Sequence, residues 1–109
     1  MAQDFENVLK TSIGTSATEV RAAANSDDAI IGMRFANKGT VAVTVDATVK
    51  NSSTSYYLIK DAPITVGGSL ELIDGGSKVV LQSGDSVEAL ASVGSSVDVI
   101  LSVVDSIST

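Results

Sequence analysis

The sequence predicts an all-β fold: a single antiparallel β-sandwich with the strand order of a jelly roll or of an immunoglobulin-like Greek key. Short apolar runs recur along most of the chain, and turn-forming residues separate them. The apolar fraction of 44% is mostly Val, Ala, Ile and Leu, with only two Phe and two Tyr. Small β-branched side chains suit a pleated sheet. No segment has the spacing of an amphipathic helix, so we expect sheets packed on sheets.

The length of 109 residues fits one domain. We expect residues 1–17 to form an N-terminal arm, because the apolar residues there are sparse. A short strand is expected in this arm over Asn7–Ser12. Residues 18–109 are expected to form the sandwich, with about eight strands.

Two strands are predicted at the start of the sandwich. Thr18–Ala23 is a weak candidate, closed by a turn-forming Asn-Ser-Asp-Asp cluster. Ala29–Ala36 alternates clearly. Because side chains point to opposite faces along a strand, this segment is expected to place Ile31, Met33 and Phe35 together on one face.

A β-hairpin is predicted next. Val41–Lys50 has Val or Ala at each odd position and mostly polar residues at even positions, so Val41 and the other odd residues are expected to face the core. Asn51–Thr54 is a polar turn, and Ser55–Lys60 is the returning strand. We interpret the Asn-Ser-Ser sequon at this turn as turn residues.

Three short strands are predicted in the second half, over Ser69–Ile73, Lys78–Gln82 and Ser86–Ser92, with Gly-containing turns between them. Pro63 lacks a backbone donor, so it is expected at a strand start or a sheet edge.

The last predicted strand is Val97–Val104. Its odd residues, all Val or Leu, are expected to face the core. The opposite face carries Ile100 and Val104 beside Asp98 and Ser102, and this half-apolar outer face indicates a side that another surface covers.

The charge of the chain excludes some partners. Thirteen acidic against seven basic residues give a net charge of −6. Nucleic-acid affinity comes mainly from Lys and Arg, so we expect no nucleic-acid partner. The same charge opposes an anionic membrane surface, and no apolar run approaches the ~20 residues of a membrane span.

The residue types argue against an enzyme. The chain has no His and no Cys, so common general bases, nucleophiles and metal ligands are missing. A glycosidase needs only two carboxylates, but its cleft usually has aromatic walls. We therefore expect no catalytic residue, no cofactor and no metal ligand.

Two kinds of turn, glycine-rich and acidic, could in principle bind a ligand. Val66–Ser69 and Asp74–Ser77 are glycine-rich, but neither has the Lys and Ser/Thr spacing of a phosphate loop, so hairpin turns are favoured. The acidic turn residues could donate oxygens to calcium, although the spacing of a calcium loop is missing and turn formation is favoured. These acidic residues are Asp27, Asp28, Asp74 and Asp85.

Two tyrosines and one arginine have side chains that could bind a ligand or a partner, but each also has a structural interpretation. Tyr56 and Tyr57 are neighbours on a strand and must point to opposite faces, so one ring is expected in the core and one at the rim. Arg34 is expected to pair with a carboxylate such as Asp98 or Asp46, with a partner protein as the alternative.

Over most of its length the chain resembles small virion structural proteins of tailed bacteriophages, many of them from phages of marine cyanobacteria and other aquatic bacteria. The most distinctive motif is YYLIKDAPITV at Tyr56–Val66. All the matching motifs are strand and turn sequences, so the resemblance carries no catalytic or ligand-binding residue. The other matching segments are Asn7–Lys10, Ile13–Ser16, Ile30–Asn37, Val41–Asp46, Gly67–Leu70, Lys78–Leu81, Gly84–Asp85 and Ser96–Val103.

The resemblance implies an accessory part of the virion. We expect a decoration or cement protein on the capsid exterior, bound to the major capsid protein as a homo-oligomer, with a trimer favoured. A neck or tail protein is the second possibility. A third is a host-surface binding module that uses exposed loops such as Asn51–Ser55.

Overall fold

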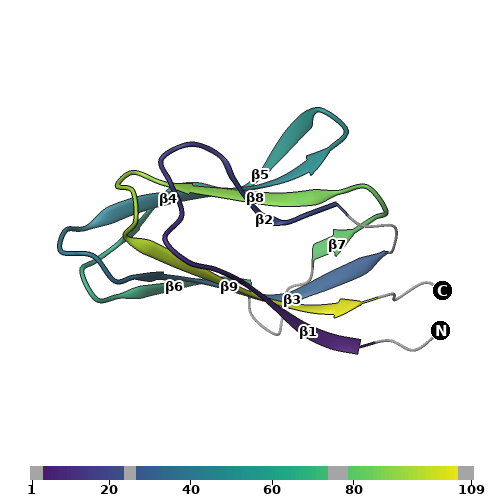
Figure 1. Cartoon of the computed structure of the whole chain (residues 1–109), viewed down its shortest axis with the longest axis horizontal. Helices are drawn as coiled ribbons and strands as arrows, with labels where there is room; N and C mark the ends of the chain where they lie inside the picture. The colour runs from purple at the N-terminus through teal and green to yellow at the C-terminus, as the bar shows by residue number, and fades with distance from the viewer. Residues whose placement is uncertain (1–3, 24–26, 74–78, 106–109) are drawn as a thin grey trace.

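The computed structural model describes residues 4–23, 27–73 and 79–105, which form two antiparallel sheets packed face to face (Figure 1). The predicted all-β class is confirmed. The described residues contain no helix, and so none that could cross a membrane. Nine strands occur in them: β1 Asp4–Lys10, β2 Thr18–Arg21, β3 Asp28–Asn37, β4 Val43–Asn51, β5 Thr54–Ile64, β6 Ser69–Ile73, β7 Val79–Leu81, β8 Ser86–Ala91 and β9 Val97–Asp105.

The strand order is that of a jelly roll. Sheet A has the order β1-β9-β3-β6, and β7 pairs with a different part of β3 from β6. Sheet B has the order β2-β8-β4-β5. The pairs β1·β9, β2·β8, β3·β6 and β4·β5 are nested in the sequence. Successive pairs of this nested series lie alternately in sheet A and sheet B. The chain is therefore arranged as one long antiparallel hairpin, with the β4–β5 turn at its tip, that is wound into two sheets.

The core lies between the two sheets and consists almost entirely of aliphatic side chains. The inward positions of β9 are all buried, as the alternation in the sequence predicts, and Phe35 is the one buried aromatic side chain among the described residues. The fully buried large side chains are Phe35, Ile13, Ile30, Met33, Leu81, Leu101, Val45, Val87, Val97 and Val99.

The N-terminal segment takes part in both the sheet and the core. β1 starts three residues before the expected Asn7 and pairs with β9 without a register shift, from Asp4 opposite Asp105 to Lys10 opposite Val99. Beyond it, the side chain of Ile13 is fully buried, and its N–H donates to the carbonyl of Val97 at 2.9 Å.

A bulge in β3 changes which residue reaches the core. Ile30 is opposite Val103 and Gly32 is opposite Ser102, so Ile31 is an extra residue in the ladder. Ile30 is fully buried and Ile31 is only half-buried. The expectation that Ile31 shares one face with Met33 and Phe35 is therefore wrong.

The hairpin of β4 and β5 is confirmed, with two differences in detail. The strand starts at Val43, and Val41 lies before it with 49% of its surface exposed, so its expected inward position is wrong. Asp46 is on the outer face, yet it is buried. The cause is a bulge in β5, where Asp61 has a φ of 54° and donates its N–H to Asp46 Oδ1 at 2.7 Å.

β5 continues past the predicted end at Lys60 and runs to Ile64. It is an edge strand that pairs with β4 alone among the described strands. Pro63 is tolerated inside it because an edge strand leaves some N–H groups without a ladder partner. The turn that follows contains Gly67 with a φ of 71°, as a turn glycine allows. Asp74, Ser77 and Lys78 lie outside the described residues.

Candidate interaction surfaces

The outer face of sheet A carries a row of apolar residues that crosses four strands. The register places Phe5 of β1 opposite Val104 of β9, Val104 opposite Ala29 of β3, and Ala29 opposite Val80 of β7. The side chain of Phe5 is 80% exposed and that of Val80 is 57% exposed, whereas Val104 is partly buried and Ala29 is buried. We call this side of sheet A the apolar face. It confirms the half-apolar outer face that the last strand predicts and extends it to three further strands.

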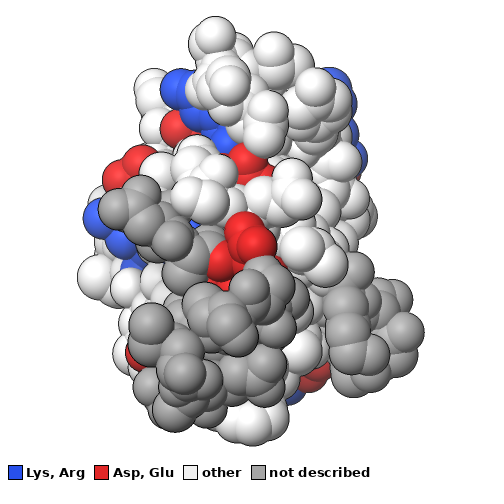
Figure 2. All heavy atoms as spheres, turned by 90° about the vertical axis from the view of Figure 1, so that its right-hand side faces the viewer, with Lys and Arg blue, Asp and Glu red and all other residues white. Residues whose placement is uncertain are grey.

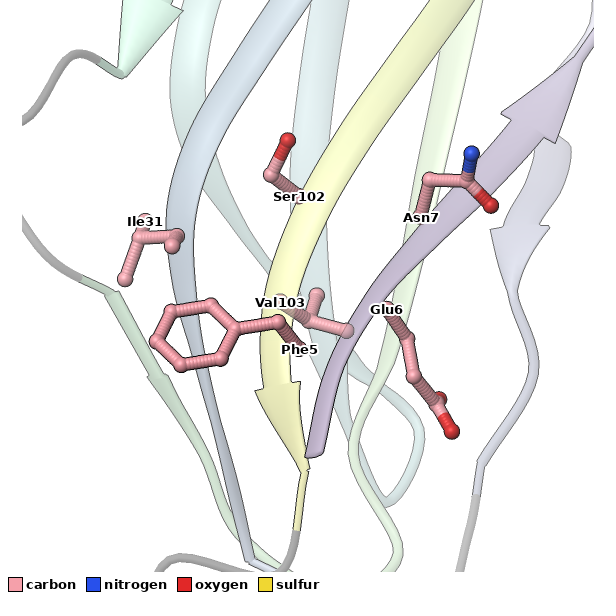
Figure 3. A pocket seen from close by; sticks show the side chains of 6 residues that line it. All are labelled: Phe5, Glu6, Asn7, Ile31, Ser102 and Val103. Carbon is pink, nitrogen blue, oxygen red and sulfur yellow. The ribbon is translucent and has the colours of Figure 1, made fainter. Parts of the chain in front are cut away.

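A hollow lies beside this row. The register aligns Asn7, Ser102 and Gly32 across β1, β9 and β3, and the last two are small. Figure 3 shows the Phe5 ring reaching across β9 toward Ile31, with Ser102 at the side of the space between them. A protruding side chain of a partner fits such a hollow, because it can contact apolar groups on two sides.

A third row on the apolar face combines apolar and charged residues. Leu9 of β1 is opposite Ile100 of β9, Ile100 is opposite Arg34 of β3, and Arg34 is opposite Glu71 of β6. The guanidinium of Arg34 donates to Glu71 Oε1, with both side chains about half exposed. Opposite charges at facing positions thus neutralise each other within the face.

The outer face of sheet B is different in character. Its register aligns Glu19 of β2, Glu88 of β8, Thr48 of β4 and Tyr57 of β5. Two carboxylates are therefore neighbours on adjacent strands. This face suits contact with water more than contact with an apolar protein surface.

The tip of the β4–β5 hairpin extends beyond the sandwich (Figure 1). It carries Tyr56 and Tyr57, which are 59% and 58% exposed. The expectation of one core ring is therefore wrong, because the tip of this hairpin turns away from the opposing sheet (Figure 1). The ammonium of Lys60 lies 5.1 Å from the centre of the Tyr57 ring, within the range of a cation–π contact.

One end of the sandwich contains a buried ion pair. The guanidinium of Arg21 in β2 donates to Asp28 Oδ2 in β3 and to the carbonyl of Asp85 at 2.9 Å. The Asp85 carboxylate accepts from Asn51 Nδ2 at 2.6 Å and from the Gln82 N–H at 3.0 Å. Acidic side chains lie near the middle of this end in Figure 2.

Three of the four acidic turn residues considered as calcium ligands take part in such contacts, and Asp74 lies outside the described residues. Asp28 and Asp85 bind the partners just described, and Asp27 Oδ1 accepts the Ser83 N–H at 2.9 Å. Among the described residues, no three acidic side chains form a group that could hold a metal ion. The carboxylates instead fix the ends of strands and the turn before β8.

Arg34, Asp98 and Asp46 each bind other residues than expected. Arg34 binds Glu71, while Asp98 lies 2.9 Å from Lys38 Nζ and Asp46 lies 3.9 Å from Lys60 Nζ. The expectation that Arg34 pairs with a carboxylate is therefore confirmed, but the carboxylate is that of Glu71 and not that of Asp98 or Asp46.

The Asp98 carboxylate ties the N-terminal segment to β9. The Lys38 ammonium lowers the pKa of Asp98 most, and the Thr11 hydroxyl and the Ser12 N–H lower it further. Both of these groups donate to Asp98 Oδ1, at 2.7 and 2.9 Å. Lys38 also donates to the hydroxyls of Thr11 and Ser12, so the network holds the chain between β1 and β2 in place.

The contributions of Phe5 and Leu9 to the apolar face were not found from the sequence. The available signal was that Phe5 and Leu9 lie on the same face of an extended strand. This signal is weak because most residues of this strand are polar or charged. The position of β1 beside β9 made the signal meaningful, and that pairing joins opposite ends of the chain.

Comparison with known proteins gives one informative likeness. No protein-family model matches the chain, and no curated protein matches it. The fold is similar to a chain from a solved structure of Bacillus endospore appendages, described as a novel family of disulfide-linked pili. The TM-score is 0.57 at 15% sequence identity, and the match covers 96% of this chain and 86% of that chain. At this identity the likeness supports the β-sandwich fold alone.

Proposed function

We propose that the chain is a non-enzymatic structural protein of a tailed-phage virion, a decoration or cement protein that binds the outside of the capsid shell as a homo-oligomer. The observation that carries the proposal is the apolar face, where Phe5, Val104, Ala29 and Val80 form one row across four strands. Exposed large apolar side chains that gather on one face of a small domain mark a protein contact, and this face carries Phe5, Leu9, Val80 and Ile100.

Two further observations support a structural role. The fold is similar to that of a chain from Bacillus endospore appendages, which are described as disulfide-linked pili. The charged residues on the apolar face are paired, since Arg34 binds Glu71 and Lys38 binds Asp98. Although the whole chain has a net charge of −6, a shell surface that approaches this face therefore contacts charges that are already paired.

The test is the position and copy number of the subunit in the particle. Imaging of virions with a labelled subunit should give many copies spread evenly over the head. A small ring of copies at one vertex would instead assign the protein to the neck or tail. Particles without the protein should assemble but release their genome more readily under heat or osmotic stress.

A variant on each face connects this result to the structure. Ile100→Lys places a charge in the centre of the apolar face and should weaken retention on particles by at least about tenfold, as loss of a central contact does. Thr48→Lys makes the same change on the outer face of sheet B and should leave retention unchanged. Equal retention of both variants would contradict a role for the apolar face.

A second candidate function is host-surface recognition by the β4–β5 tip. Exposure of both Tyr56 and Tyr57 favours it, because exposed aromatic rings can stack on sugars or bind protein surfaces. The double variant Y56A/Y57A should then give particles that are stable but adsorb poorly to the host. Normal adsorption of these particles would eliminate this candidate and leave decoration untouched.

A further inference from the structure

The described residues have five edge strands, which differ in how open they are to further pairing. β7 has only three residues. β2 has four residues and a register shift, and β5 has two register shifts and contains Pro63. β6 has five residues and a register shift in its ladder with β3. Short length, bulges, proline and charged side chains are the usual means by which an edge is protected from pairing.

β1 has none of the first three protections, although it carries the charged residues Glu6 and Lys10. It is seven residues long, contains neither Pro nor Gly, and pairs with β9 in a continuous register. On its other side, no strand of the described residues pairs with it. β2, the edge strand of the facing sheet on the same side, is only four residues long and leaves room for an approaching chain. β1 is therefore the open edge at which another strand can be added.

We propose that β1 pairs antiparallel with β1 of a second copy, about a two-fold axis at Asn7. This inference goes beyond the proposed function, since it concerns the purified chain whatever it binds. The register sets Phe5 opposite Leu9 of the second copy, and Leu9 opposite Phe5 of the second copy. Each exposed apolar side chain of β1 thus gains an apolar cross-strand neighbour on the same outer face.

Other registers are poorer. An axis at Val8 would set Leu9 opposite Asn7 and Phe5 opposite Thr11, so both large apolar side chains would face polar ones. A two-fold axis perpendicular to the sheet also keeps the apolar faces of both copies on one side. The two copies of sheet A then join into one continuous sheet, and the apolar face doubles in width.

The charges of β1 are compatible with this pairing. Glu6 and Lys10 are both exposed, and in the register at Asn7 each Glu6 lies diagonal to Lys10 of the second copy. The two Glu6 carboxylates are also diagonal to each other, and each has a Lys10 ammonium on its other side. The contact is isologous, so it gives a closed dimer in place of the trimer expected from the sequence.

Disulfide trapping tests the register directly. The chain has no cysteine, so a single introduced thiol reports one contact. Residues that face each other across antiparallel strands have Cα atoms about 4.5–5.5 Å apart, which a disulfide can bridge. Under mild oxidation N7C should form a covalent dimer rapidly. V80C, exposed on the same face but three strands away, is the control and should form little covalent dimer.

Charge exchange tests the Phe5–Leu9 pairing. By light scattering after size exclusion the natural chain should have the mass of a dimer. F5K and L9E should each raise the dimer dissociation constant by on the order of tenfold. The double variant F5K/L9E should recover much of the loss, because each copy then offers a Lys opposite a Glu. V80K, the matched charge on the same face, should stay dimeric.

Several results would overturn the proposal. A monomer or a trimer in place of the dimer contradicts the two-fold contact, and equal cross-linking of N7C and V80C contradicts the edge. A double variant no better than F5K alone contradicts the register. Phe5 is mostly exposed, so none of these variants should alter the far-UV circular dichroism of the sandwich. Because virions are not needed, failure here is distinct from failure of the proposed function.

Discussion

The molecule contains two arginine–carboxylate pairs in very different surroundings. Arg21 and Asp28 have side chains that are 8% and 5% exposed, and they join sheet B to sheet A at one end of the sandwich. Arg34 and Glu71 are 52% and 50% exposed, and they lie within the apolar face. The buried pair cannot be separated without leaving a charge away from water, whereas the exposed pair already has water around it. Charge therefore connects the layers in one region and adapts a contact surface in the other.

The largest expected effect follows from breaking the buried pair. Arg21→Ala leaves the Asp28 carboxylate without its guanidinium and the Asp85 carbonyl without a donor. The free energy of unfolding should fall by about 3–5 kcal/mol, measured by urea denaturation with circular dichroism. The double variant R21M/D28L, which removes both charges, should recover most of this loss. A cost below about 1 kcal/mol for Arg21→Ala would mean that the pair does not hold the sheets together.

An intermediate effect is expected at Asp98, where the carboxylate is partly exposed. Its pKa is lowered in the folded state, first by Lys38 and then by Thr11 and Ser12. A lowered pKa stabilises the fold above the unfolded value and loses this contribution as pH falls through the folded value. Asp98→Asn should therefore lower the melting temperature at neutral pH, by less than Arg21→Ala does.

The pH dependence of this difference is the check. Melting temperatures of the natural chain and of the Asp98→Asn variant should begin to converge below about pH 4, the usual pKa of an aspartate, and should meet only below the lowered pKa of Asp98 in the folded state, where its carboxylate is protonated. A difference that persisted unchanged at lower pH would show that packing of the side chain, and not its charge, stabilises the contact.

The smallest effect is expected for the exposed pair. Glu71→Gln should change the free energy of unfolding by at most about 1 kcal/mol, and added salt should remove most of that change. If a partner covers the apolar face in the assembled particle, the same variant should weaken binding by about 2–5 kcal/mol, because Arg34 is then left buried and unpaired. Equal effects on stability and on binding would mean that the pair stays in water.

The sequence predicted the fold class because most strands carry local signals. The alternation in Val97–Val104 and the tight turns around Gly67 and Gly84 need no information from distant residues. The choice between a jelly roll and an immunoglobulin-like order was left open, since it depends on pairings such as β1 with β9 that join the two ends of the chain. Periodicity does not encode such pairings.

The errors in detail have physical causes of the same kind. Asp46 is buried because the β5 bulge at Asp61 folds over it, and Ile31 leaves the core because of the β3 bulge. A bulge reverses the inward and outward positions beyond it, so alternation alone misplaces the residues around it. The part of the apolar face on β9 was predicted from Ile100 and Val104. The parts on β1, β3 and β7 required the pairing of these strands.

The first and last strands are neighbours in sheet A, and this allows the order of the strands along the chain to be changed. Because Asp4 of β1 faces Asp105 of β9 in an antiparallel ladder, a short linker could join these strands as an ordinary hairpin. New ends could then be opened at Ser52, in the exposed turn of the projecting hairpin. Such a circular permutant should reach the same sandwich, since every ladder is kept and only the order of synthesis changes.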